Sequence, residues 1–111
     1  MKKLNEFGLS DETTKWILRT IQVFPEIEEV IIFGSRAKGT SKPGSDIDFA
    51  IKGNFPEFNY PERLKTMLQD GLYLPYFFDV VDYYKITNPD LKEHIDRVGK
   101  IFYSRKEAVI K

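Results

Sequence analysis

Apolar and polar residues recur along the chain with two spacings, one typical of amphipathic helices and one typical of strands. Between Ser10 and Pro25 the apolar side chains return every three or four residues, which predicts a helix. Ser10 is a suitable N-cap for this helix, because its hydroxyl can accept a backbone hydrogen bond from the first turn. The same spacing over residues 61–70 and 89–98 predicts two further helices, each beginning at a proline.

Four shorter runs predict strands. Residues 30–33 form a mostly β-branched run that stops at Gly34, and residues 45–52 alternate between apolar and polar positions. Residues 77–83 and 101–103 are the other two runs. Since 111 residues fit one compact domain, this alternation of helices and strands predicts a single domain of the α/β or α+β class with two layers.

The composition excludes several classes of function. Lys plus Arg and Asp plus Glu both number 17, so the formal net charge is zero, which argues against broad binding to a nucleic-acid backbone. The chain has no cysteine, and disulfides, thiolate zinc sites and cysteine nucleophiles are therefore excluded. No apolar run approaches the roughly 18 residues that a membrane span needs. We therefore expect a cytoplasmic protein that acts neither in a membrane nor directly on nucleic acid.

Asp46 and Asp48 are the first candidates for chemistry. Two residues apart on a strand, they would point to the same face, with Cα atoms about 6.5 Å apart. Carboxylates held in this way repel each other, and a divalent cation such as Mg²⁺, which prefers oxygen ligands, would relieve the repulsion. On its own, however, an Asp-x-Asp is more often only an exposed acidic strand face.

Gly34 and Ser35 are the second candidates. A strand that ends at Gly-Ser and leads into a short helical turn, here expected over residues 35–38, directs backbone N–H groups at a place where phosphate can bind. The alternative is an ordinary tight turn with a helix cap. A P-loop is excluded, because the lysine that should precede Thr40 is absent.

The two features together are more specific than either alone. Gly-Ser after an apolar strand, followed by Asp-x-Asp on the next strand, resembles the signature of the DNA polymerase β-like nucleotidyltransferases. Residues 33–39 (FGSRAKG) and 43–49 (PGSDIDF) are similar to the minimal nucleotidyltransferase (MNT) subfamily, as are the first helix and residues 99–103. The resemblance implies the polymerase β-like fold, with a small mixed β-sheet and helices packed on it. It also implies that residues 1–111 are a single minimal nucleotidyltransferase domain.

The resemblance further implies which residues are catalytic. Asp46 and Asp48 would hold two Mg²⁺ ions that bridge the nucleotide phosphates. A third acid, on the strand over residues 77–83, would complete one metal site and help to remove the acceptor proton. Asp79 and Asp82 are three residues apart, so only one of them can face the pair, and the resemblance favours Asp79. The residues expected to contact the phosphates of the substrate ATP are Gly34, Ser35, Arg36 and Ser45.

For the MNT subfamily the implied activity is transfer of AMP from ATP to a tyrosine of a partner HEPN-domain RNase toxin, so that the chain acts as the antitoxin. Larger family members carry an acceptor-binding domain, for which this chain has no room, so the acceptor is expected to be another protein. One alternative is a binding antitoxin that neutralises its partner by contact alone. A less favoured alternative is a small-molecule (antibiotic) nucleotidyltransferase.

Other conspicuous residues are expected to be structural. His94, the only histidine, should be a surface or half-buried helix residue rather than a ligand. The aromatic group around the third strand should lie partly in the core and partly on a partner surface, because monomers rarely expose such clusters. This group is Tyr73, Tyr76, Phe77, Phe78, Tyr83 and Tyr84.

Overall fold

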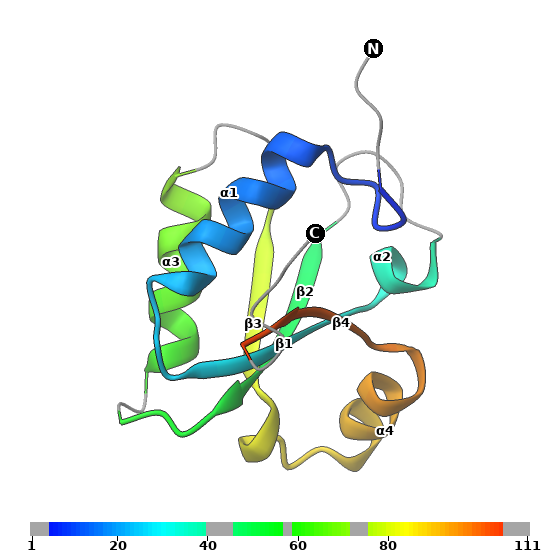
Figure 1. Cartoon of the computed structure of the whole chain (residues 1–111). Coiled ribbons are helices and arrows are strands. Elements are labelled where there is room, and N and C mark those ends of the chain that lie inside the picture. Colours follow the sequence, from blue (N-terminus) through cyan, green and yellow to red (C-terminus); the bar gives the residue numbers. More distant parts are fainter. Residues whose placement is uncertain (1–4, 40–45, 57–58, 72–75, 106–111) are drawn as a thin grey trace.

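A computed structural model describes residues 5–39, 46–56, 59–71 and 76–105 of the chain. Its elements follow the order α1, β1, α2, β2, α3, β3, η1, α4, β4, where η1 is a 3₁₀ turn (Figure 1). Of the predicted loop over residues 39–44, only Gly39 belongs to the described residues. The predicted α+β class is confirmed, as is the predicted sequence of helices and strands.

The four strands form one mixed sheet. They are β1 (Ile27–Phe33), β2 (Ile47–Gly53), β3 (Phe78–Asp82) and β4 (Lys100–Ser104), and their order in the sheet is β3-β2-β1-β4. β1 is antiparallel to both of its neighbours, whereas β2 and β3 are parallel. A parallel pair needs a crossover connection, and α3 provides it.

Helices α1 (Asp11–Gln22) and α3 (Tyr60–Gly71) cover one face of the sheet (Figure 1). The Thr13 N–H donates to Ser10 Oγ at 3.2 Å, which confirms Ser10 as the N-cap of α1. The apolar sides of the two helices and of the strands form the main core, in which Leu64 is fully buried. This core fixes the central strands from one side.

The second face of the sheet is also partly covered, which corrects the prediction of only two layers. Helix α4 (Pro89–Val98) lies over this face, and its Ile95 forms a smaller buried cluster with Phe33 and Ala50. The continuous apolar run of β1 is the reason, because Ile31 and Phe33 need cover on the side opposite to Val30 and Ile32.

Two local features were not predicted. β1 begins three residues before the predicted run, at the buried Ile27, and an ion pair joins Glu29 to Lys52 of β2, 3.5 Å apart. The 3₁₀ turn η1 (Tyr83–Lys85) follows β3 directly. Apolar periodicity does not predict either feature, because Glu28 and Glu29 separate Ile27 from the apolar run and η1 is shorter than one helical period.

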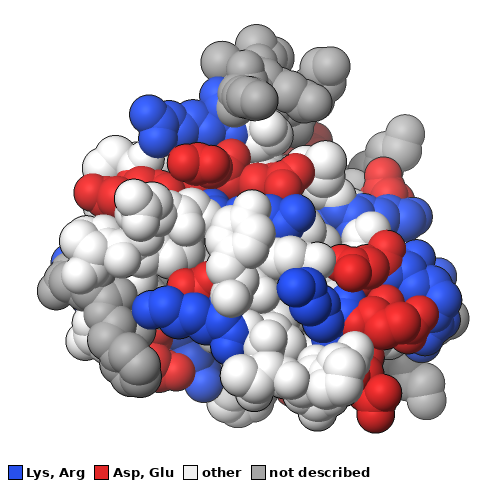
Figure 2. Space-filling model, turned by 90° about the horizontal axis from the view of Figure 1, so that it is seen from below, with Lys and Arg blue, Asp and Glu red and all other residues white. Residues whose placement is uncertain are grey.

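Charge is mixed on the surface seen from below the view of Figure 1. Basic and acidic side chains are interspersed there, with uncharged surface between them (Figure 2). This face has no continuous basic stripe of the kind that tracks a nucleic-acid backbone. Among the described residues, no helix is long and apolar enough to cross a membrane.

Truncation of Leu64 tests the main core. Leu64→Ala is expected to lower the free energy of unfolding by about 2–5 kcal/mol, because it leaves a cavity between α3 and the sheet. Met67→Ala on the same helix is the control and should cost less than about 1 kcal/mol, since Met67 is 43% exposed. Urea unfolding followed by circular dichroism measures both values, and equal effects would contradict this account of the core.

Candidate active site

The turn after β1 lies directly against the carboxylate of Asp48. Phe33, the last residue of β1, pairs with Asp48 across the sheet, and α2 (Ser35–Lys38) starts two residues later. Gly34 between them has a φ of 79°, in the region that favours glycine. A Cβ on Gly34 would lie only 2.4 Å from Asp48 Oδ2, so no other residue fits without displacing the carboxylate.

Three carboxylates share the sheet face opposite to α1 and α3. Asp48 pairs with Asp79 in the parallel register of β2 and β3. Their neighbours Phe49 and Phe78 point into the main core, so Asp48 and Asp79 point to the other side. Asp46 is two residues before Asp48 and follows the same alternation. Asp46 and Asp79 are exposed, whereas Asp48 is half-buried between them and the turn.

The position of Asp48 is electrostatically unfavourable when it is ionised. Burial raises the pKa of Asp48 above its usual range, and the nearby charges of Asp79 and Asp46 raise it further. His94 acts in the opposite direction and lowers the pKa of Asp48. A carboxylate in this environment gains free energy when a cation binds beside it.

These carboxylates fit a hard divalent cation by donor type, because Mg²⁺ prefers carboxylate oxygens. Within the described part of the chain, however, no group of three or more His, Asp or Glu side chains converges closely enough to hold a metal ion. The assignment of Asp46, Asp48 and Asp79 as metal ligands and catalytic residues therefore stays a prediction.

Asp82 is directed away from these carboxylates. It pairs with Ile51, whose side chain belongs to the main core, and it is the N-cap of η1. Its carboxylate accepts a hydrogen bond from the Tyr84 N–H at 3.1 Å. A capping role thus accounts for Asp82, and the sequence-based preference for Asp79 agrees with the register of β3.

Arg36 occupies a position that does not support the expected phosphate contact. Its side chain is 1% exposed, and its Nη1 donates to the carbonyl oxygens of Phe7 at 2.8 Å and Gly8 at 3.3 Å. The guanidinium also lies over the ring of Tyr76, 5.0 Å from the centroid. Burial lowers the pKa of Arg36, and Tyr76 and Asp46 counteract this effect. Arg36 therefore braces the segment before α1 against the turn.

The other predicted phosphate ligands are only partly described. Gly34 and Ser35 are half-buried and lie at the start of α2, beside Asp48. Ser45 lies outside the described residues, and its expected role stays a prediction.

No pattern in the sequence indicated that His94 would lie near the carboxylates. His94 is half-buried, as expected, but its ring packs edge-on against Phe33 with the centroids 6.3 Å apart. Its influence on the pKa of Asp48 places it near the acidic face. Only the packing of α4 on the second sheet face brings them together, and helical spacing does not predict on which face a helix packs.

The aromatic group divides as predicted between core and surface. Phe78 and Tyr83 are buried, Tyr76 is half-buried, and Phe77 and Tyr84 are exposed. Tyr73 lies outside the described residues.

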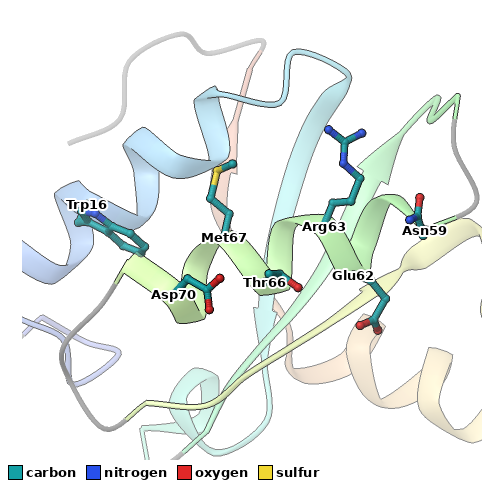
Figure 3. A pocket seen from close by; sticks show the side chains of 7 residues that line it. All are labelled: Trp16, Asn59, Glu62, Arg63, Thr66, Met67 and Asp70. Carbon is teal, nitrogen blue, oxygen red and sulfur yellow. The ribbon is translucent and has the colours of Figure 1, made fainter.

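A surface pocket between α1 and α3 is separate from the carboxylates. Its volume is about 610 Å³, with Trp16 contributed by α1 and the other lining residues by α3 and Asn59 before it (Figure 3). It lies on the sheet face opposite to Asp46, Asp48 and Asp79. Since none of these three lines it, the pocket is not the candidate active site.

Comparison with known proteins gives consistent matches over most of the chain. The family described as polymerase beta, nucleotidyltransferase matches residues 15–108. The chain is 35% identical over 98 residues to the probable protein adenylyltransferase MntA of Haemophilus influenzae. This match covers 86% of this chain and 83% of that protein.

Solved structures show the same fold. A toxin–antitoxin structure with AMP-PNP matches with a TM-score of 0.66 and 24% identity, covering 95% of this chain and 77% of that chain. The toxin–antitoxin structure MntA–HepT matches with a TM-score of 0.65 and 18% identity, covering 89% and 76%. A complex of a tri-AMPylated Shewanella oneidensis HEPN toxin with an MNT antitoxin matches with a TM-score of 0.64 and 18% identity, covering 87% and 74%.

The solved structures, all below 25% identity, support the fold alone. The family match spans more than half of the chain, and the relative from Haemophilus influenzae exceeds 30% identity over most of both proteins. The region of this chain that the family matches includes the Gly-Ser turn and the strand with Asp48. The chain therefore belongs to the polymerase beta nucleotidyltransferase family.

Proposed function

We propose that this chain is an Mg²⁺-dependent protein adenylyltransferase that moves AMP from ATP to a tyrosine of a partner HEPN toxin and so acts as its antitoxin. One observation carries the proposal: Asp48 lies between the Gly34 turn on one side and Asp79 on the other. A phosphate-binding turn, a carboxylate pair and a third acid in this order are the parts that nucleotidyl transfer needs.

The turn after β1 would bind the pyrophosphate part of ATP, which is the leaving group of the reaction. Gly34 has no side chain to keep phosphate oxygens away, and the backbone N–H groups at the start of the short helix α2 would donate to the same oxygens. Ser35 adds a hydroxyl at the start of this helix, and Ser45 stays the predicted further contact. These groups would hold the β- and γ-phosphates of ATP.

The carboxylates would act on the reacting phosphate. Asp46, Asp48 and Asp79 would hold the Mg²⁺ ions, which when bound neutralise charge on the triphosphate. The tyrosine oxygen would form a bond to the α-phosphorus while the bond to the bridging oxygen of the β-phosphate breaks, and pyrophosphate leaves. Asp79, which pairs with Asp48, would accept the phenolic proton of the acceptor.

The relatives support a protein acceptor. The relative from Haemophilus influenzae is named as a probable protein adenylyltransferase, and the MNT antitoxin of Shewanella oneidensis is bound to a tri-AMPylated HEPN toxin. An antitoxin that works by contact alone has no need for carboxylates that repel each other on one strand face. A small-molecule nucleotidyltransferase is less consistent with these relatives.

Mass spectrometry of the partner tests the activity. The chain, incubated with ATP, Mg²⁺ and the HEPN toxin encoded beside it, is expected to add the mass of AMP to a toxin tyrosine. Asp79→Asn should reduce the rate by roughly 100-fold or more, because it removes the proposed proton acceptor. Asp82→Asn is the matched control on the same strand and should stay close to the unsubstituted rate, since asparagine can also cap η1.

The absence of AMP on the toxin with the unsubstituted chain would reject the proposal. The contact-only alternative predicts that the double substitution Asp46→Asn, Asp48→Asn still inhibits the toxin RNase fully. Equal rates for the Asp79 and Asp82 variants would show that the third acid has been assigned wrongly.

Thermal unfolding tests the electrostatic cost of the site. Because its pKa is raised in the folded state, ionised Asp48 destabilises the fold above that pKa, and the cost vanishes below the ordinary aspartate pKa of about 3.9. Asp48→Asn should therefore raise the Tm by a few degrees at pH 7 without Mg²⁺, and the gain should disappear near pH 3.

Added Mg²⁺ is expected to raise the Tm of the unsubstituted chain more than that of Asp48→Asn, since it binds the folded state through this carboxylate. Asp82→Asn serves again as the control and should show no gain at pH 7. A Tm for Asp48→Asn at or below that of the unsubstituted chain would contradict this account.

A further inference from the structure

Phe77 is an exposed aromatic residue beside the carboxylates. Its side chain is 65% exposed, whereas the next residue, Phe78, is 2% exposed. Phe78 packs into the main core, and side chains of an extended segment alternate, so Phe77 points to the face that carries Asp79. Contact with a partner would remove this ring from water, which is favourable for binding.

The backbone of Phe77 is held in place on both sides. Its carbonyl oxygen accepts a hydrogen bond from the Ile47 N–H at 2.8 Å, which extends the parallel pairing of β2 and β3 by one step. The residue before it, Tyr76, lies under the guanidinium of Arg36, and the residue after it is buried. The exposed position of Phe77 is therefore fixed by its neighbours, as a binding surface requires.

The sheet order places Phe77 on one particular side of the reaction. Since Ile47 pairs with Phe78, Phe77 lies next to Asp46, just as Asp79 lies next to Asp48. β2 separates these two β3-side positions from the turn after β1, because the order is β3-β2-β1. Phe77 and the Gly34 turn are thus on opposite sides of the acidic pair.

The geometry of in-line displacement indicates which reactant, the nucleotide or the acceptor, approaches Phe77. The attacking and leaving oxygens lie on opposite sides of the phosphorus. If pyrophosphate leaves on the side of the Gly34 turn, the acceptor must enter from the side of β3. Phe77 and Asp79 are the exposed residues that β3 and the described segment leading into it present on this face, because Val81 is half-buried under α4.

We propose that Phe77 is a docking residue for the protein acceptor and packs against the aromatic ring of the incoming tyrosine or its immediate neighbour. This inference rests on the proposed function, because it names the side from which that same site receives its acceptor. Aromatic pairs of this kind favour an edge-to-face or offset contact and add to the free energy of burial. Phe77 would thus select an aromatic acceptor and orient its hydroxyl toward Asp79.

Steady-state kinetics of AMP transfer tests the inference. Phe77→Ala is expected to raise the KM for the toxin by about 5- to 10-fold, as the loss of an aromatic contact predicts. The KM for ATP should stay unchanged, since the nucleotide phosphates lie on the other side of β2. Phe77→Tyr and Phe77→Trp should restore the KM for the toxin, because they keep an aromatic surface.

Tyr84→Ala is the matched control, because Tyr84 is also an aromatic residue with 65% exposure but lies beyond the far end of β3. It should leave both KM values unchanged. The Tm of Phe77→Ala should equal that of the unsubstituted chain, since truncating an exposed side chain removes little packing.

Isothermal titration calorimetry of the toxin in the presence of AMP-PNP measures the affinity of each variant for the toxin and does not depend on AMP transfer. Weaker toxin binding by Phe77→Ala, but not by Tyr84→Ala, supports the inference. An unchanged KM and affinity for the toxin overturns it, and so does an increase in the KM for ATP. No transfer by the unsubstituted chain, with weaker toxin binding by Phe77→Ala, rejects the proposed function and leaves the docking role supported.

Discussion

The contact between the Cα of Gly34 and the carboxylate of Asp48 is the constraint on which the site depends. It requires a residue without a side chain, a positive φ and a fixed register between β1 and β2. A slip of one residue in that register would turn Asp48 into the core and bring Phe49 to the site face. The apolar residues of the central strands, buried under α1 and α3, prevent such a slip. The main core thus determines that the Gly34 turn contacts Asp48 and not a neighbouring residue of β2.

The same arrangement opposes stability. Asp48 is half-buried between two other acids, and its raised pKa reports the cost of keeping it charged. Hydrophobic burial on the other face of the sheet offsets this cost, because Ile47 and Phe49 alternate with the acids and are fully buried. Each acidic position on β2 therefore has an apolar neighbour that anchors the strand.

Much of this could be predicted from the sequence, because helical and strand spacing, caps and the Gly-Ser and Asp-x-Asp spacing are local patterns. Strand alternation allowed only one of Asp79 and Asp82 to face the acidic pair, the family resemblance favoured Asp79, and the register of β2 and β3 agrees with that choice. Long-range packing had no such signal. Arg36 next to Gly-Ser suggested a phosphate contact, yet its guanidinium is bound by carbonyls of Phe7 and Gly8, far away in the sequence. The cover of the second sheet face by α4 was missed for the same reason.

β3 is an edge strand, and among the described strands β2 alone pairs with it. β1, by contrast, has a strand on each side, so the Gly34 turn and Asp48 belong to the best-supported part of the sheet. Edge elements open locally at lower free energy than central ones. Opening of β3 would remove Asp79 and Phe77 together and leave the turn and Asp48 in place. Local opening of β3 would thus remove the proposed acceptor side of the site while the proposed nucleotide side stays folded, which makes the two sides separable units of local stability.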